Sequence, residues 1–460
     1  MKKLLGICLW FCVVLPLAAQ VDSVHIENIQ VVGNKRTKTH IILREVQFEK
    51  GGKYSREQFD ELVEQTENNL TNLALFNLIS IVEVELDNQE YNIIIRVIER
   101  WYIIPFPIFE HAETNFNTWW LTRDFSRTNY GLFVEHLNFR GRKEYLYLKA
   151  KFGYTQQFAL KYQLPYIDKK QKLGAGIWTS YYQNVEIVYG TENNKRDFYN
   201  TPTGSVRDDF EVKGQLRYRN KIHSLHHMEV TYRHSKVDNE VLDLNPNYFM
   251  TSGNELQFTG IHYNFIHEKR DNFAYPLKGY YLKAGINKVG LGMLPNEPDI
   301  LVNRLEYQHH LPIMKNFYAS AGFRTKYTFY QELPYYLQRG FGWENYVRGY
   351  EYYVIDGQHF ALFKTNLRYR LIESNNKPKE GRAPRRFDGF HYAFYLSAFA
   401  DAGYVHDELW QDNNPISNTW MSSVGFGIDF VTMYDKVFRF EYSFNRLGEN
   451  GFFLHLNQAF

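Results

Sequence analysis

Cysteine is nearly absent from this 460-residue chain, and its only two copies are Cys8 and Cys12. Both fall within an apolar run that starts after Met1-Lys2-Lys3 and ends before Ala18-Ala19-Gln20. A charged start, a short apolar core and small residues are typical of a secretory signal peptide, here residues 1–20. A retained membrane anchor is the alternative, but the run is short for a span of about 20 residues. Without the leader, no thiol, disulfide or cysteine metal site remains.

Long apolar stretches are also missing, since no segment beyond Gln20 is long and apolar enough for a membrane helix. The net charge is only +2, which gives no indication of nucleic-acid binding. Aromatic residues are abundant instead, at 17% of the chain, with 36 Tyr and 36 Phe. This composition fits an outer-membrane β-barrel, whose strands alternate apolar and polar residues between aromatic girdles. A soluble all-β protein is the alternative.

The sequence patterns of common enzymes are lacking as well. There is no Gly-x-Ser-x-Gly elbow and no P-loop. His223, His226 and His227 lie close together, as do His309 and His310, but no pattern supplies a third metal ligand. We therefore expect no catalytic residue, no metal site and no cofactor.

Residues 21–100 are expected to form a small α+β domain in the order β-α-α-β-β. Ser55 opens the second helix, and Gln58 three positions later completes a capping-box pattern. Apolar and acidic residues then alternate from Ile79 to Leu86, as in a half-buried strand. The segment has about the minimum size for a core of its own.

Three short segments of this domain carry a resemblance. The turn Val32-Gly33-Asn34, the pair Arg44-Glu45 and the segment Leu75-Phe76-Asn77, in this order, resemble a POTRA domain. The resemblance implies a periplasmic docking module that adds extended peptides to a sheet edge through backbone hydrogen bonds. If the family's strand order holds, the expected docking residues on that edge are Ile79, Ile81, Glu83 and Glu85. A plain spacer domain is the alternative.

Residues 101–460 contain many segments in which apolar and polar residues alternate. In residues 436–445 the apolar face is aromatic, and the polar face carries Arg439 and Glu441. A sandwich core also tolerates alternation, but charges on the polar faces of many long strands fit a wet lumen better.

The strand count supports a closed barrel. About eleven segments, among them 103–110 and 172–190, precede the stretch 337–358, and five follow it. The sum of about sixteen is even, as a closed bacterial barrel requires. The predicted fold is mainly β, with an α+β POTRA domain followed by a 16-stranded antiparallel transmembrane barrel.

The stretch from Leu337 to Gln358 interrupts this alternation. Its centre is Val347-Arg348-Gly349-Tyr350, and Gly340, Gly342 and Gly349 permit unusual backbone angles. An arginine at such a tip, flanked by aromatic residues, indicates a loop that is folded onto another part of the protein.

Over the whole chain after the leader, the sequence resembles the BamA/TamA superfamily of outer-membrane protein-insertion and translocation barrels. Val347-Arg348-Gly349-Tyr350 is similar to the family's VRGF/Y loop motif, and Phe399-Ala400-Asp401-Ala402-Gly403 to its F-x-D-x-G strand motif. The resemblance implies that Arg348 folds into the lumen and pairs with Asp401, although both could instead be separately solvated. The expected residues of this lumen loop lock are Arg348, Gly349, Tyr350, Phe399, Asp401 and Gly403.

One position departs from the family pattern. The family often has a second acidic residue just before a Leu-Arg pair on the strand after the loop. Here Asn366 takes that place, before Leu367-Arg368. The lock is therefore expected either to rest on Asp401 alone or to use Glu351 locally.

A weak seam is expected where the barrel closes. The first barrel strand would contain Pro105 and Pro107, and proline removes ladder donors. Such a strand would pair poorly with the last segment, 451–460, which suits a lateral gate that accepts an incoming strand in lipid. The alternative is that this proline segment is only a linker. The expected seam residues are Ile104, Pro105, Leu454 and Phe460.

These features together predict a factor without enzymatic activity in the outer membrane of a Gram-negative bacterium. It would capture unfolded polypeptides at a periplasmic POTRA domain and insert or export them through the barrel seam or lumen. Expected partners are outer-membrane or secreted polypeptides, membrane lipids and accessory assembly subunits. A passive pore is the alternative, but it would need neither a POTRA domain nor a folded-in loop. An outer-membrane lipase would need a Ser/His/Asp set that the sequence does not offer.

Overall fold

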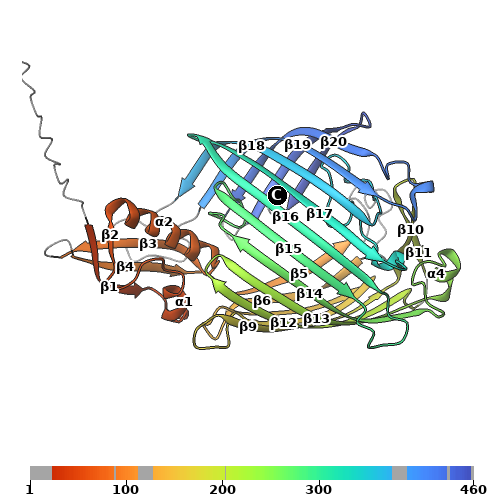
Figure 1. Cartoon of the computed structure of the whole chain (residues 1–460), viewed down its shortest axis with the longest axis horizontal. Helices are drawn as coiled ribbons and strands as arrows, with labels where there is room; N and C mark the ends of the chain where they lie inside the picture. Colours follow the sequence, from red (N-terminus) through yellow and green to blue (C-terminus); the bar gives the residue numbers. More distant parts are fainter. Residues whose placement is uncertain are drawn as a thin grey trace, which may run out of the picture.

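A computed structural model describes residues 23–86, 90–111, 128–201, 204–375, 391–432 and 436–456. The chain forms an N-terminal α+β domain beside a large rolled sheet of antiparallel strands (Figure 1). The expected leader and Phe460 lie outside the described residues. Within those ranges, no helix is long and apolar enough to cross a membrane.

The N-terminal domain has one strand more than expected. Its elements are β1 (Ser23–Val32), α1 (Thr39–Leu43), β2 (Lys53–Ser55), α2 (Arg56–Asn72), β3 (Phe76–Glu85) and β4 (Glu90–Glu99). The sheet order is β2-β1-β4-β3, so β3 pairs with β4 alone and forms an outer edge. The side chain of Ser55 accepts a hydrogen bond of 3.3 Å from the Gln58 N–H and caps α2. Ile26, Phe59 and Ile93 are fully buried between the helices and the sheet.

Sixteen strands form one continuous antiparallel sheet, which confirms the predicted fold class. They are β5 (Ile103–His111), β6 (Thr128–Phe139), β7 (Glu144–Gly153), β8 (Thr155–Leu164), β9 (Leu173–Asn184), β12 (Arg207–Lys221), β13 (Ser224–Val237), β14 (Glu255–Glu268), β15 (Gly279–Val289), β16 (Ile300–Met314), β17 (Phe317–Tyr330), β18 (His359–Asn375), β19 (His391–His406), β20 (Trp420–Thr432), β21 (Lys436–Asn445) and β22 (Asn450–Leu456). Each strand pairs with its sequence neighbours in the sheet, from β5 at one end to β22 at the other.

The expected single strand over residues 172–190 is wrong. That segment contains β9 and then β10 (Glu186–Glu192), which pairs with β11 (Lys195–Asn200) in a separate hairpin. Asn193 and Asn194, with φ of 51° and 57°, form the two-residue turn that such a hairpin favours. The hairpin lies at the end of the barrel farthest from the N-terminal domain, which we call the far end (Figure 1).

Alternating side chains give the barrel wall an apolar outside and a polar inside. Phe426 and Leu454 on the outer face are 58% and 54% exposed, as expected of side chains that would contact lipid. On the inner face Asp429 and Glu441 are buried. The alternation read from the sequence therefore assigns these side chains to the correct faces.

The N-terminal domain contacts the barrel at its other end, which we call the near end (Figure 1). The Glu45 carboxylate accepts hydrogen bonds of 2.6 and 2.7 Å from both terminal nitrogens of Arg219 on β12. The Asn138 amide donates to the Thr37 hydroxyl at 2.9 Å, and Tyr166 packs into the domain's apolar core. Polar and apolar contacts thus both join the two parts of the chain.

Candidate functional site

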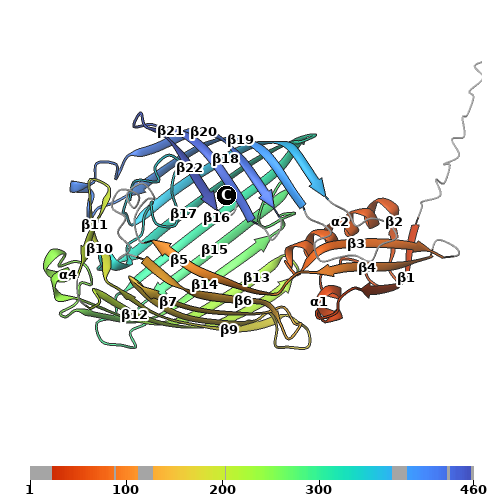
Figure 2. The ribbon, with the colours of Figure 1, turned by 180° about the vertical axis from the view of Figure 1, so that it is seen from behind.

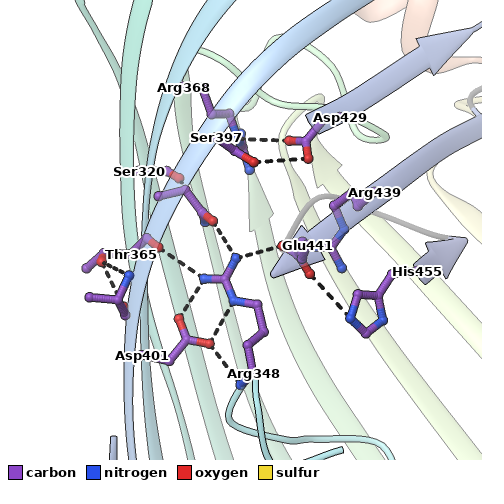
Figure 3. Close-up of polar contacts among 12 residues, drawn as sticks. Ser320, Arg348, Thr365, Arg368, Ser397, Asp401, Asp429, Arg439, Glu441 and His455 are labelled. Atoms are coloured by element: carbon purple, nitrogen blue, oxygen red, sulfur yellow. Dashed lines mark hydrogen bonds and ion pairs between the residues drawn. The ribbon is translucent and has the colours of Figure 1, made fainter. Parts of the chain in front are cut away.

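The loop between β17 and β18, residues 331–358, folds against the inner face of the barrel rather than extending away from it. Figure 3 shows Arg348 on this loop pointing toward side chains of β18, β19 and β21. Arg348 and Asp401 are only 2% and 3% exposed. The structure therefore brings together the two residues on which the expected lock depends.

Every N–H group of the Arg348 guanidinium has an acceptor. Its Nε and Nη2 donate to the two Asp401 oxygens at 2.8 and 2.6 Å. Its Nη2 also donates to the Thr365 carbonyl at 3.1 Å, and Nη1 donates to Asn366 Oδ1 at 2.7 Å and Glu441 Oε1 at 3.2 Å. A buried guanidinium is tolerated when all five donors are satisfied by charged and neutral acceptors.

Aromatic packing and small residues shape the space around this group. The Arg348 guanidinium carbon lies 3.8 Å from the centre of the Phe399 ring, in a cation–π contact. Gly349 has φ of +85°, a conformation that strongly favours glycine. A Cβ atom at Gly403 would lie 2.6 Å from side-chain atoms of both Phe341 and Val347. The glycine of the strand motif therefore leaves room for the loop to lie against the wall.

The second acidic partner of Arg348 differs from the one expected. Asn366 supplies a neutral acceptor where the family pattern often has a carboxylate. Glu351 does not contact Arg348 in the described structure; its Oε1 lies 3.5 Å from Nε2 of His455. The second acid is Glu441, which reaches Arg348 from β21. The prediction that Glu351 serves locally is wrong, because its side chain is directed toward β22.

Sequence reasoning missed the connection from the loop to the last strand. His455 on β22 lies 3.3 Å from Glu441 Oε2 (Figure 3), and its Nδ1 lies 3.3 Å from the Tyr346 hydroxyl of the loop. The Tyr346 and His455 rings also stack at 5.5 Å. Strand alternation places Glu441 on the inner face, but no local signal shows which residues it meets there.

A second buried charge pair lies on the same wall, closer to the N-terminal domain. The Arg368 Nε lies 3.9 Å from Asp429, which accepts hydrogen bonds from the hydroxyls of Ser397 at 3.3 Å (Figure 3) and Tyr275 at 2.7 Å. The inner face of β18 to β21 therefore carries two polar clusters, each centred on a buried arginine.

Of the four expected seam residues, three lie in the part of the chain that the structure describes and one does not. Ile104 and Pro105 lie in β5, the first strand of the sheet, and not in a linker. Leu454 lies in β22, the last strand, and Phe460 is outside the described residues. Among the described residues no ladder joins β5 to β22, which stand at the two ends of the sheet (Figure 2).

The expected docking edge on the N-terminal domain is the outer strand β3. Ile79 and Ile81 pack against the domain core, whereas Glu83 accepts from Arg56 at 2.5 and 3.0 Å. One edge of β3 has no neighbouring strand in the described structure.

The far end is covered by the hairpin and the loop together. The Thr191 hydroxyl donates to Asp356 Oδ2 at 2.6 Å, and the Trp343 indole donates to its Oδ1 at 3.1 Å. Val354 N–H donates to the Asn194 carbonyl at 2.9 Å. The described residues contain no group of three or more His, Cys, Asp or Glu side chains arranged to hold a metal ion.

A 16-stranded barrel with a folded-in arginine loop and a small α+β domain at one end defines a class of outer-membrane proteins. Residues 138–452 match the model of the Omp85 superfamily domain, and residues 24–100 match the POTRA model described as surface antigen variable number repeat. The chain belongs to the Omp85 superfamily. It is therefore a non-enzymatic transporter or insertase of the bacterial outer membrane, and proteins of this kind bind substrate polypeptides.

Solved structures share this fold at low sequence identity. BamA from Haemophilus ducreyi lacking POTRA domains 1–3 is 15% identical with a TM-score of 0.50, over 95% of this chain and 83% of that chain. CdiB from Escherichia coli is 13% identical with a TM-score of 0.53, over 95% of this chain and 74% of that chain. A search among curated proteins found no match. These similarities support the fold.

Proposed function

We propose that this protein inserts polypeptides into the outer membrane, and that β3 receives them before the seam between β5 and β22 accepts them as new strands. The observation that carries this proposal is the absence of a ladder between β5 and β22 in the described structure. Unpaired backbone groups facing lipid are costly, so an edge of this kind favours the addition of an incoming strand.

Capture at the N-terminal domain follows from the position of β3. A strand with one free edge can pair with an extended peptide of almost any sequence, because the bonds are made by the backbone. In this proposal the near end and the N-terminal domain lie in the periplasm of a Gram-negative bacterium. Outer-membrane polypeptides are the proposed substrates, and accessory subunits would dock on the same domain.

The proposed lock keeps one side of the seam in place. Arg348 holds the loop against β19, and the contacts of Glu441 and His455 extend this attachment to β21 and β22. A charge-assisted fork in a water-poor site is stronger than a surface ion pair. In this scheme β22 remains a fixed template while β5 separates from it.

The contacts between the hairpin and the loop at the far end favour insertion over export through the lumen. The β10–β11 hairpin is bonded to the loop through Thr191, Asn194 and their partners, so a chain passing along the lumen would have to break these contacts. The same cover argues against a passive pore, which needs an open path for solutes.

Disulfide crosslinking of the seam tests this function. The pair Ile104 and Leu454 is unsuitable because its members lie on opposite faces: Ile104 pairs with inward-facing Glu135, whereas Leu454 is 54% exposed outside. Ile103 and Phe109 on β5 lie on the same outer face as Leu454 and Leu456 on β22, so cysteines at these positions are the pairs to test.

The protein without its leader has no other cysteine, so each introduced pair can be oxidised selectively. We expect oxidised seam pairs to abolish complementation of a depletion strain and reduction to restore it. A matched pair at Val424 and Phe444, which face each other across β20 and β21, should crosslink without loss of function. Full activity with a quantitatively crosslinked seam would contradict the proposal.

A further inference from the structure

A cavity of about 640 Å³ lies at the near end, between the N-terminal domain and the inner wall of the barrel. Arg44 and Glu45 line it from the domain, and Tyr145, Gln163 and Arg217 line it from the wall. Its volume falls within the range of about 300–1,000 Å³ that is usual for ligand pockets.

Charge is unevenly distributed around this cavity. On one side the two cations are neutralised, because Arg270 lies 2.5 Å from Glu268 and Arg324 lies 2.8 Å from Glu306. The opposite side carries five cations: Lys172, and four that we call the basic cluster, namely Arg44, Lys143, Arg217 and Arg219. One carboxylate, Glu45, lines the cavity on that side, and it is already paired with Arg219.

Three members of the basic cluster lack an anionic partner. Within the described part of the chain, no carboxylate lies within ion-pair distance of Arg44, Lys143 or Arg217. Burial, partly opposed by Glu45 and reinforced by the neighbouring arginines, lowers the pKa of Lys143 to about 8. Burial and the charge of Arg219 likewise lower the pKa of Arg44. Concentrated like charge in a partly dehydrated cavity is unfavourable until an anion enters.

Glu45 shows which chemistry the basic cluster accepts. It is 3% exposed, and both of its oxygens receive hydrogen bonds from the Arg219 fork, at 2.6 and 2.7 Å. Burial raises the pKa of Glu45, but the hydrogen bond and charge of Arg219, together with the charges of Lys143 and Arg44, outweigh it and the pKa is lowered. A carboxylate carried on a protein segment is therefore held firmly at one place in the cluster.

We propose that the basic cluster is a binding site for acidic segments of substrate polypeptides, and that Glu45 occupies part of it until such a segment arrives. Arginine clusters recognise acidic motifs through charge-assisted forks, and a peptide can offer several carboxylates at once. This inference rests on the proposed function and names a chemical class of substrate for it.

A lipid headgroup is a poorer fit for the same cations. The cavity is lined by inward-facing side chains of the barrel and by the N-terminal domain, so a lipid would have to withdraw its acyl chains from the bilayer. Removing apolar chains from a hydrocarbon environment is strongly unfavourable. A flexible polypeptide can reach the cavity without that cost.

Peptide binding to the full-length protein in detergent micelles tests the proposal. The probe is a fluorescent twelve-residue peptide that alternates Glu and Ser, with Gln/Ser and Lys/Ser peptides as controls, measured by anisotropy at pH 7. We expect binding of the Glu peptide only, with affinity falling steeply as salt increases. Inorganic phosphate should compete weakly, because a single small anion meets fewer of the cations.

Three variants and one control locate the site. Arg217→Gln and Lys143→Gln should each weaken binding of the Glu peptide about fivefold, which corresponds to the loss of roughly one charge-assisted contact. Glu45→Gln should increase the affinity for the Glu peptide about threefold, because the substitution releases Arg219 for the peptide. Lys236→Gln, a cation at the far end paired with Glu255, should change nothing. Lys143 lies in a turn, so its variant remains informative if the Arg217 variant does not fold.

The possible results distinguish the acidic-segment inference from the proposed function. Equal binding of the Glu and Gln peptides, or unchanged affinity in the Lys143 variant, would overturn the inference. Phosphate competing as strongly as the Glu peptide would make this a small-anion site instead. If no acidic peptide binds while seam crosslinking abolishes activity, this inference fails and the proposed function stands. If acidic peptides bind and the crosslinked protein is fully active, the proposed function fails.

Discussion

The two ends of the sixteen-stranded sheet are held in different ways. β22 is contacted from the lumen by the loop, through the Tyr346–His455 stack and the approach of Glu351 to His455. Among the described residues, no hydrogen bond, ion pair or ring contact joins β5 to that loop, and the strand neighbour of β5 is β6. β5 also carries Pro105 and Pro107, which lack N–H donors.

This difference indicates which side of the seam moves. Strands β18 and β19, which carry the partners of Arg348, span 17 and 16 residues, whereas β5 and β22 span 9 and 7. Fewer ladder bonds and missing donors lower the cost of local opening. We therefore expect β5 to separate from β22 while the loop keeps β22 aligned with the rest of the wall.

The largest change should come from removing the arginine that holds the loop. Arg348→Ala leaves Asp401 and Glu441 buried without their shared cation, at a cost of about 3–5 kcal/mol. We expect the folded band to convert to the unfolded one at a lower temperature in semi-native electrophoresis, and complementation to fail. Arg446→Ala, at an exposed arginine beyond β21, is the control. An unchanged conversion temperature would remove the basis for calling β22 the fixed side.

The contact between the N-terminal domain and the barrel can be tested separately from the two ends of the sheet. The pKa of Glu45 is lowered from its ordinary 4.5, so its pairing with Arg219 stabilises the contact above that value and is lost as pH falls through the lowered pKa. We expect acidification to loosen the domain by about 1.5–3 kcal/mol, detected as proteolytic cleavage between domain and barrel. Glu45→Gln should be loose at pH 7 and lack the acid transition; an identical transition in that variant would refute the assignment.

Restoring backbone N–H donors to β5 should reduce the difference between the two end strands of the sheet. Pro105 and Pro107 are two residues apart, so their nitrogens face the same edge of the strand. Pro105→Thr/Pro107→Thr should strengthen pairing by about 0.5–1.5 kcal/mol for each restored N–H that finds an acceptor. We expect slower substrate insertion and a higher yield of oxidised seam crosslinks. Pro312→Thr in β16, an internal strand, serves as the control, and faster insertion by the double variant would contradict the model.

The smallest change should follow from loosening β22 alone. His455→Gln removes the ring that stacks on Tyr346 and lies beside Glu441, at about 0.5–1.5 kcal/mol. Amide hydrogen exchange should become faster in β22 and stay unchanged in β19, where Asp401 still holds Arg348. His226→Gln on β13 is the control. Equal acceleration in β19 would mean that the loop moves as one unit with β22.

Much of the architecture could be predicted because it depends on local patterns. Alternation assigns Asp429 and Glu441 to the inner face, since successive side chains of a strand point in opposite directions. The number of strands in the sheet follows from the same signal. The β10–β11 hairpin was missed because it follows β9 after a single residue, so the two strands read as one apolar-rich run.

Contacts between distant strands could not be read in this way. Asp401 was named from a motif, whereas Glu441 and His455 carry no motif and lie 93 and 107 positions beyond Arg348 along the chain. The Glu45–Arg219 pair joins residues 174 positions apart in different domains. Such pairs depend on strand register and on how the domains meet, and no short window of sequence contains either.

The amino-acid sequence by itself determined the strands and their inner and outer faces, because backbone periodicity encodes them, and the resemblance of two short motifs to a known family implied the pairing of the loop arginine with its strand aspartate. Only the tertiary structure decided that the guanidinium takes a second carboxylate from β21, that the loop reaches β22, and that a basic cavity forms beneath the N-terminal domain. Those features arise when the sheet rolls up and charges from remote segments are buried together, where each must find a partner.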